Sequence, residues 1–314
     1  MPYSRYNLAK PFLIHAHYHA PRGKKRLYML AAELSHKYLY PSDLLVGIIG
    51  AEGSGKSTLI RGLFPGLELT NDDDGINNSP APLYGDLKNN YFSGHTFHID
   101  IRYEMAFKQK YQIVEAINNA IRLEKRVVIE HFDLIYETLG YNAQVIFSIG
   151  EDVRIYRPTV FGPSPLDIKK EVDATYKYRL MTHTAEDLTC CVLTKNYGFE
   201  QPEFHSDVRH GFVIGFPEKP DIDIAEVEKK VKKFIEADIP VNPGEGSFIV
   251  VGDNQIPCTG KRCHVKSTKE IEYFRLLENF IYDPISEEYL LVGLVGREDI
   301  QCIGMLPPMN DQQD

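Results

Sequence analysis

Hydrophobic residues in the first half of the chain follow two patterns. Some form short continuous runs, and others recur every three or four positions. Short apolar runs bounded by glycine or polar residues are typical of strands buried on both faces. They predict strands within residues 44–49, 95–104, 124–135 and 143–150. Two other stretches, 24–39 and 109–125, repeat apolar residues every three or four positions, which is the spacing of an amphipathic helix. This order of strands and helices predicts an α/β fold with a parallel sheet.

The pattern changes after residue 157. Residues 157–170 contain three prolines and are interpreted as a linker or an irregular crossing. Helical spacing then returns at 171–193 and 221–241, and an apolar strand is predicted at 289–296. We therefore expect a first domain over residues 1–160 and a second, α+β domain over residues 161–314.

Composition adds few constraints. The formal net charge is −9, and the basic clusters at 22–26, 229–233 and 261–266 are interpreted as solvated faces. No run of 18 apolar residues occurs, so no membrane-spanning helix is expected. Five cysteines without a regular spacing favour a reducing, cytoplasmic location. The histidines of HAHYH at 15–19 would share one strand face, as a metal site or, by preference, as outward-facing polar residues.

The most specific motif is GAEGSGKS at residues 50–57, which fits G-x-x-x-x-G-K-[ST] between a predicted strand and a predicted helix. Glycines let backbone N–H groups point at phosphate oxygens, and the helix N-terminus adds partial positive charge. Lys56 would reach the terminal phosphates and Ser57 would bind Mg²⁺. The predicted nucleotide-binding residues are Gly50, Gly53, Ser54, Gly55, Lys56, Ser57 and Thr58.

A nucleotide site with Mg²⁺ also needs a carboxylate. Glu130, at the end of a predicted strand, is the first candidate, and Asp133 and Asp100 are the alternatives. Asp73, in the acidic loop 71–80, is the candidate catalytic base, although a mobile loop without that role is the alternative interpretation. The loop and the segment FDLIYETL resemble small P-loop kinases. Because no N-K-x-D motif occurs, the resemblance implies ATP as the nucleotide.

His183 and Asp187 are four residues apart on a predicted helix, so both can reach one ion or one substrate. A solvated helix face is the alternative. Residues 170–280 resemble the second additional domain of alanyl- and threonyl-tRNA synthetases, which also occurs as free-standing alanyl-tRNA editing proteins. Three segments carry the resemblance: HTAEDL, the strand and helix from HGFVIGF to ADIPV, and CHVKSTKEIEYF.

The resemblance implies a zinc site formed by His183, Asp187, Cys258 and His264. Two features depart from the family pattern: Asp187 replaces a histidine, and Cys258 precedes His264 by six positions rather than four. Cys263, next to His264, is the less favoured cysteine. Thr268 and Glu270 match family positions near the pocket, although a helix-start role for Thr268 is equally compatible. Arg179 is expected either to face phosphate or to lie on the helix surface.

The implied function is hydrolysis of mischarged tRNA, serine or glycine on alanine tRNA, or action on a related aminoacyl compound. ATP would serve phosphorylation or a conformational step. A small-molecule or nucleotide kinase whose second domain only binds substrate or tRNA is the alternative, and a non-catalytic ATP-gated tRNA-binding module is a third possibility. ATP, Mg²⁺ and Zn²⁺ are the expected cofactors. The segment from residue 309 is expected to be disordered.

Overall fold

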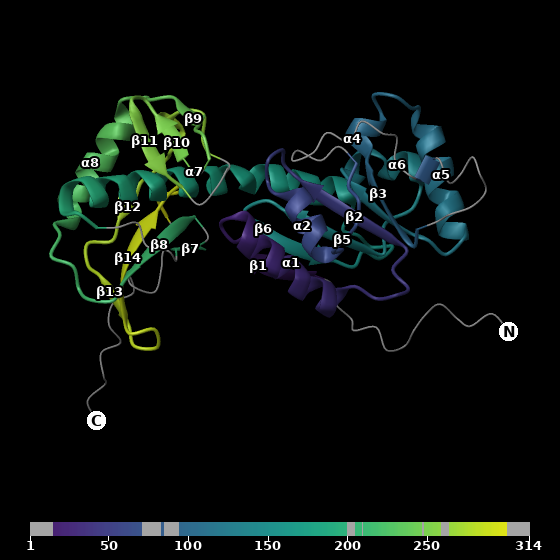
Figure 1. Cartoon of the computed structure of the whole chain (residues 1–314), viewed down its shortest axis with the longest axis horizontal. Coiled ribbons are helices and arrows are strands. Elements are labelled where there is room, and N and C mark those ends of the chain that lie inside the picture. Colours follow the sequence, from purple (N-terminus) through teal and green to yellow (C-terminus); the bar gives the residue numbers. More distant parts are fainter. Residues whose placement is uncertain are drawn as a thin grey trace. The chain divides into compact units, whose positions relative to one another are not determined.

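The computed structural model describes residues 15–70, 83–84, 94–199, 205–208, 210–246, 248–258 and 264–299. The chain divides into two compact units (Figure 1). Unit 1 comprises Met1–Ala20 and Lys24–Thr175, and unit 2 comprises Pro21–Gly23 and Tyr176–Asp314. The division lies within helix α7 (Pro165–Tyr197), so each unit contains part of this helix.

Unit 1 is built on a six-stranded mixed sheet with the order β1-β6-β5-β2-β4-β3. The strands are β1 (His15–His19), β2 (Leu45–Gly50), β3 (Thr96–Asp100), β4 (Arg126–Glu130), β5 (Val145–Ile149) and β6 (Asp152–Tyr156). The four strands β3, β4, β2 and β5 run parallel, with β2 in the middle of the sheet. β6 pairs antiparallel with β5, and β1 pairs antiparallel with β6.

The four strands predicted from the sequence are the four that run parallel, and β6 and β1 add antiparallel pairs at one edge of the sheet. Only Gly150 and Glu151 separate β5 from β6. Parallel neighbours need a crossover of a dozen or more residues, whereas a two-residue connection joins antiparallel strands. β1 extends this antiparallel edge, and its three histidines are exposed, as expected for outward-facing polar residues.

Helices cover both faces of this sheet. They are α1 (Lys24–Tyr38), α2 (Lys56–Leu63), α4 (Ile101–Glu104), α5 (Lys110–Arg122) and α6 (Tyr136–Leu139), with a 3₁₀ turn η1 (Phe132–Leu134). One buried cluster joins α1 and α2 to Val46 and Val128. Another joins α5 and the start of α7 to Val127 and Ile129. Consecutive residues of β4 thus enter opposite cores, as the strand period of two requires.

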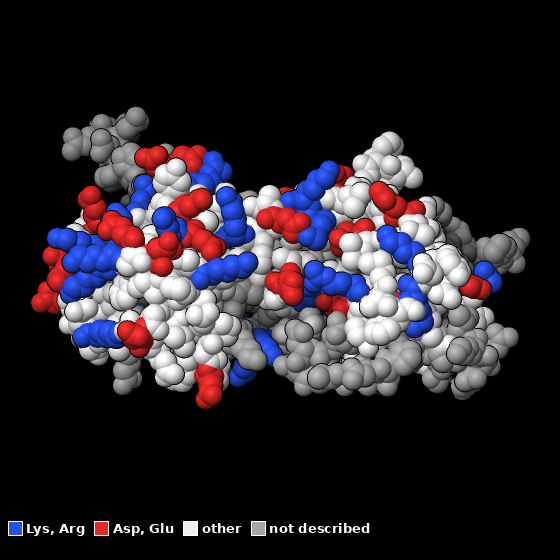
Figure 2. All heavy atoms as spheres, turned by 90° about the horizontal axis from the view of Figure 1, so that it is seen from above, with Lys and Arg blue, Asp and Glu red and all other residues white. Residues whose placement is uncertain are grey.

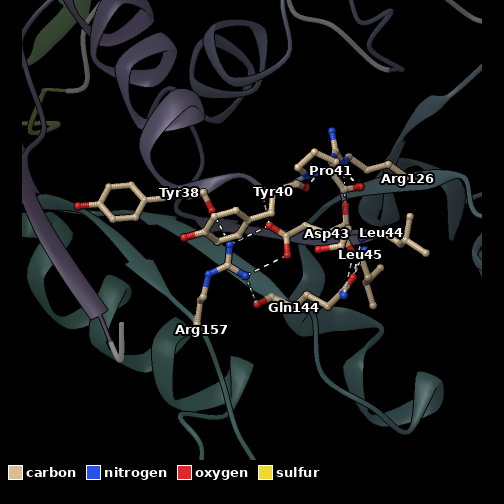
Figure 3. Close-up of polar contacts among 10 residues, drawn as sticks. Tyr38, Tyr40, Pro41, Asp43, Leu44, Leu45, Arg126, Gln144 and Arg157 are labelled. Atoms are coloured by element: carbon tan, nitrogen blue, oxygen red, sulfur yellow. Dashed lines mark hydrogen bonds and ion pairs between the residues drawn. The ribbon is translucent and has the colours of Figure 1, made fainter. Parts of the chain in front are cut away.

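A polar network fixes the amino ends of the central strands (Figure 3). Arg157 donates to both carboxylate oxygens of Asp43, over 3.0 and 2.8 Å. Arg126 donates to the backbone carbonyls of Asp43 and Tyr40. Gln144 accepts from two consecutive backbone N–H groups at the start of β2, over 2.6 and 3.1 Å. The strands β2, β4 and β5 are therefore held in register at the end opposite to residues 50–57.

Unit 2 contains two antiparallel sheets. The larger has the order β12-β14-β8-β7 with β13 also paired to β14, and the smaller has the order β11-β10-β9. The larger sheet consists of β7 (His205–Val208), β8 (Gly211–Phe216), β12 (Arg275–Leu276), β13 (Ile281–Asp283) and β14 (Glu288–Leu294). The remaining elements are α8 (Ile224–Glu236), β9 (Val241–Pro243), β10 (Phe248–Val251), β11 (Asn254–Pro257) and the 3₁₀ turn η2 (Thr268–Glu270).

Helix α7 passes through the core of unit 2. Every residue from 181 to 193 is buried, so this stretch has no solvated face. A helix buried all round belongs to the interior of a domain, and here polar residues such as His183 and Asp187 are buried with the apolar ones. The interpretation of this pair as a solvated face is therefore wrong. The linker predicted at 157–170 is also wrong from Pro165 onward, where α7 begins.

Among the described residues, no helix is both long and apolar enough to cross a membrane.

Candidate functional sites

Residues 50–57 form the connection between β2, the central strand of unit 1, and helix α2. Gly55 immediately precedes α2 with a φ of 101°, a left-handed conformation that glycine adopts without steric cost. A Cβ atom on Gly50 would lie 2.8 Å from the Ser54 side-chain oxygen and 2.9 Å from Cγ of Lys56. Gly55 is thus required by its backbone conformation, and Gly50 by the close approach of neighbouring side chains. All predicted nucleotide-binding residues lie in this connection and the first turn of α2.

Lys56 points from this loop to the neighbouring strand. Its ammonium group donates to the carbonyl oxygen of Ala51 over 2.9 Å and lies 3.5 Å from Oε1 of Glu130. Glu130 ends β4, which runs parallel to β2 with Ile48 opposite Glu130. Both charged side chains are buried. Glu130, the first candidate among the predicted carboxylates, thus forms an ion pair with Lys56.

Nε2 of His98 faces the other oxygen of Glu130. Nδ1 of His98 accepts a hydrogen bond from the backbone N–H of Thr70 over 3.0 Å, so the ring proton is assigned to Nε2. Nε2 lies 3.5 Å from Oε2 of Glu130. Burial alone would raise the pKa of Glu130, but His98 and the charge of Lys56 outweigh it and lower the pKa. Glu130 is therefore an ionised carboxylate.

Asp100 and His131 lie beside Glu130. Asp100 is opposite Glu130 in the register of β3 and β4, and it caps α4 by accepting from the backbone N–H of Tyr103 over 3.2 Å. One ligand atom each of Asp100, Glu130 and His131 lies within 4.8 Å of the others. Burial lowers the pKa of His131, and the nearby Lys56 lowers it further.

His131 is a residue that sequence reasoning missed, although its position directly after a strand-terminal acid was a usable signal. Asp133 is not a member of this group, and burial raises its pKa. Asp73, the candidate catalytic base, lies outside the described residues, as does Cys263.

In unit 2, three of the four predicted zinc ligands lie together. One ligand atom each of Asp187, Cys258 and His264 lies within 4.8 Å of the others. Asp187 comes from the middle of α7, Cys258 directly follows β11, and His264 precedes η2. His183 is outside this group, although the centroids of the His183 and His264 rings are 6.4 Å apart. Although His264 follows Cys258 by six positions instead of four, the ligand atoms of the two residues lie close together.

The hydrogen bonds of Thr184 determine the proton position on His264. The single hydroxyl proton of Thr184 goes to the carbonyl of Leu180 over 2.9 Å. Nδ1 of His264 must therefore be the donor in its 3.3 Å contact with the same hydroxyl oxygen. Nε2 then carries a lone pair and lies 3.8 Å from Oδ2 of Asp187. A lone pair facing a carboxylate in the interior is unfavourable unless a cation lies between them.

His264 is also uncharged. Burial lowers its pKa to about 3, with smaller contributions from His183 and Arg22. Among the described residues, its Nε2 atom has no hydrogen-bond partner. A neutral imidazole, a carboxylate and a thiol are the groups that Zn²⁺ selects, with the thiol bound as thiolate. The residues present thus fit a zinc ion.

Arg22 is the second residue that sequence reasoning missed. It was assigned to a solvated basic cluster, but its side chain is fully buried in unit 2. Its guanidinium forms ion pairs with Glu186 and with Asp187, the latter over 3.1 Å, and donates to the carbonyl of His183 over 3.3 Å. One guanidinium thus faces two carboxylates, so a divalent cation bound with the Cys258 thiolate would balance the remaining charge.

Other residues of the predicted pocket have structural roles. Thr268 donates to the carbonyl of Phe234 over 2.6 Å and accepts from the N–H of Ile239 over 2.9 Å, which ties η2 to the end of α8. The Glu270 carboxylate accepts from the N–H of Ser267 as part of a capping box. Arg179 is buried on α7 rather than on the helix surface.

No known protein family and no curated protein matches this chain.

Proposed function

We propose that unit 1 binds ATP with Mg²⁺ and transfers its terminal phosphoryl group. The observation that carries this proposal is the buried Lys56–Glu130 pair, which joins the glycine loop after β2 to the carboxyl end of β4. Ligands of open α/β sheets bind at the carboxyl ends of the strands. The loop supplies backbone N–H groups, and α2 supplies the partial positive charge of its first turn.

Each residue then has a defined task. Lys56 leaves Glu130 and pairs with the terminal phosphates, where it stabilises charge as the phosphoryl group moves. The Ser57 hydroxyl and the Glu130 carboxylate would hold Mg²⁺, which neutralises phosphate charge when bound. Nε2 of His98 faces the Glu130 carboxylate over 3.5 Å and would orient it. The phosphate acceptor is a small molecule or nucleotide, as in the kinases that the loop resembles.

Replacing Lys56 by methionine is expected to weaken ATP binding by about 10- to 150-fold, because a hydrogen bond to a charged group contributes about 1.5–3 kcal/mol. Isothermal titration calorimetry with Mg-ATP measures this change. Lys170→Met, at an exposed position of unit 1, is the matched control and should bind ATP as the unmodified protein does. Equal affinity of all three proteins would contradict an ATP site at this loop.

A second function is favoured by one observation in unit 2, the lone pair of His264 that faces Asp187. We propose that Asp187, Cys258 and His264 hold Zn²⁺ and that unit 2 acts on an aminoacyl ester, either serine or glycine on alanine tRNA or a related small aminoacyl compound. Zn²⁺ polarises a carbonyl or a water molecule when bound. A second site of this kind removes products that a synthesis pocket cannot reject by size.

Surface charge bears on the choice between these substrates. On the face shown in Figure 2, Lys and Arg alternate with Asp and Glu across the described residues instead of forming a continuous basic surface. Affinity for nucleic acid comes mainly from phosphate neutralisation by clustered basic residues. The described part of this face therefore offers no continuous basic surface for a tRNA backbone.

Zinc should copurify with the protein and be lost from the Cys258→Ser variant, as measured by plasma emission spectrometry after dialysis. Cys191→Ser, which changes another buried cysteine of unit 2 outside the group, should retain the metal. Deacylation of seryl-, glycyl- and alanyl-tRNA of the alanine type is assayed on the same preparations. If the protein retains zinc but hydrolyses none of these esters, the metal-binding proposal stands and the ester function is refuted.

A further inference from the structure

The group formed by Asp100, Glu130 and His131 differs from a purely oxygen-based magnesium site. Its three side chains come from the ends of two adjacent parallel strands, β3 and β4, and all three are buried. Their ligand atoms lie within 4.8 Å of one another. Two ligands of one small divalent ion are at most about 4.2 Å apart, because each metal–ligand distance is about 2.1 Å. Only small side-chain shifts would therefore close the group around an ion.

A second, independent observation points into the same group. The side chain of His98 is 98% buried, given its 2% exposure, and its Nε2 makes no hydrogen bond among the described residues. Nε2 lies 3.5 Å from Oε2 of Glu130, and Thr70 fixes the other ring nitrogen. Metal-binding carboxylates are themselves hydrogen-bonded by a second layer of residues that orients them. His98 can orient Glu130 in this way if its Nε2 atom moves slightly closer to Oε2 of Glu130.

The backbone of His131 adopts a conformation that is uncommon outside glycine. It has φ 59° and ψ 46°, the left-handed conformation, directly after β4 and before η1. This conformation costs a residue other than glycine about 1–2 kcal/mol. Glycine would form the same turn without that cost. The histidine instead places a buried imidazole 3.9 Å from Oε1 of Glu130.

We infer that Asp100, Glu130 and His131 bind a first-row transition-metal ion, and that Mn²⁺ binds there more tightly than Mg²⁺. Mg²⁺ prefers six oxygen ligands in a near-ideal octahedron, whereas imidazole nitrogen is a ligand of transition metals. The site shares Glu130 with the proposed ATP site, and it refines the metal requirement proposed there. The positions of the three side chains support the site by themselves, whether or not ATP binds beside it.

The charges agree with this inference. Asp100 and Glu130 supply two carboxylates, and Lys56 pairs with Glu130. If Lys56 turns to a phosphate, a divalent ion balances both carboxylates. The three groups hold the ion through two oxygens and one nitrogen, which leaves positions for water or for phosphate oxygens.

The test measures Mn²⁺ and Mg²⁺ affinity of the full chain without nucleotide, by electron paramagnetic resonance for Mn²⁺ and calorimetry for both ions. The unmodified protein should bind Mn²⁺ about tenfold or more tightly than Mg²⁺. His131→Gly, which keeps the left-handed backbone accessible, should lose about tenfold in Mn²⁺ affinity and little in Mg²⁺ affinity. His95→Gly, at an exposed position before β3, is the matched control. Circular dichroism and thermal melting verify that both variants fold.

Two further variants separate this site from the others. Lys56→Met should lose ATP affinity but retain Mn²⁺ binding, so failure of the ATP proposal and failure of the metal inference give different results. Cys258→Ala, which disrupts the group in unit 2, should also retain the Mn²⁺ site. An affinity ratio of Mn²⁺ to Mg²⁺ that does not change in His131→Gly overturns the inference, as does loss of the Mn²⁺ site in Cys258→Ala.

Discussion

Replacement of Arg22 by methionine is expected to reduce the free energy of unfolding of unit 2 by about 3–5 kcal/mol, the effect of removing one partner from a buried ion pair. The guanidinium is fully buried and pairs with both Glu186 and Asp187. Methionine has much of the side-chain volume of arginine. The loss of stability therefore reflects mainly the loss of the charge. Without Arg22, two adjacent carboxylates remain in the interior and each raises the cost of ionising the other.

Urea-induced unfolding followed by circular dichroism measures this change, with a slope that tests for two-state behaviour. Lys25→Met is the matched control, because Lys25 is exposed three positions along the chain from Arg22. It should alter the free energy of unfolding by less than about 0.5 kcal/mol. Adding Glu186→Gln to Arg22→Met should recover part of the lost stability, since one uncompensated carboxylate is removed. Equal stability of Arg22→Met and Lys25→Met would show that the buried pairs contribute nothing.

Glu130→Gln is expected to slow ATP turnover by about 100- to 1000-fold, the loss seen when one preorganised electrostatic group is removed from an active site. The amide has nearly the same shape as the carboxylate but lacks its charge. It cannot balance Lys56 or hold a divalent ion with equal strength. The fold should be preserved, because glutamine has nearly the volume of glutamate and its amide oxygen can face Nε2 of His98 as the carboxylate does.

Release of inorganic phosphate or ADP from ATP, measured under saturating Mg²⁺ and again under Mn²⁺, gives the turnover. Glu115→Gln on the exposed face of α5 serves as the control and should turn over ATP at the unmodified rate. ATP affinity of Glu130→Gln is measured alongside, to separate binding from turnover. Turnover within threefold of the unmodified protein would place the essential carboxylate elsewhere in unit 1.

The glycine loop and Glu130 could be predicted because their local pattern determines their structure. A buried strand, glycines at fixed spacing and a helix place residues 50–57 without long-range information. Glu130 follows from the same logic, since an acid at the carboxyl end of an apolar strand lies at the ligand-binding edge of a parallel sheet. The pairing with Lys56 then depends only on β4 being adjacent to β2.

Other features depend on contacts between distant segments, which leave little local signal. Arg22 lies in a basic stretch whose composition resembles a solvated surface, yet its partners are more than 160 positions away. The burial of His183 and Asp187 follows from sheets packed around α7, not from the helix's own pattern. The antiparallel β6 was missed because its sequence DVRIY contains a charged pair, and Arg154 is stabilised there by Asp152 and Glu171.

Unit 2 is discontinuous in the chain, because Pro21–Gly23 belongs to it while the residues on either side belong to unit 1. A recombinant fragment that starts at residue 176 would lack Arg22 and would have to bury Glu186 and Asp187 without their guanidinium. Such a fragment is a poor reagent for metal or substrate assays, and a negative result from it would say little about the whole protein. Supplying residues 15–30 as a separate peptide, and asking whether it restores a folded fragment, turns this discontinuity into a complementation assay.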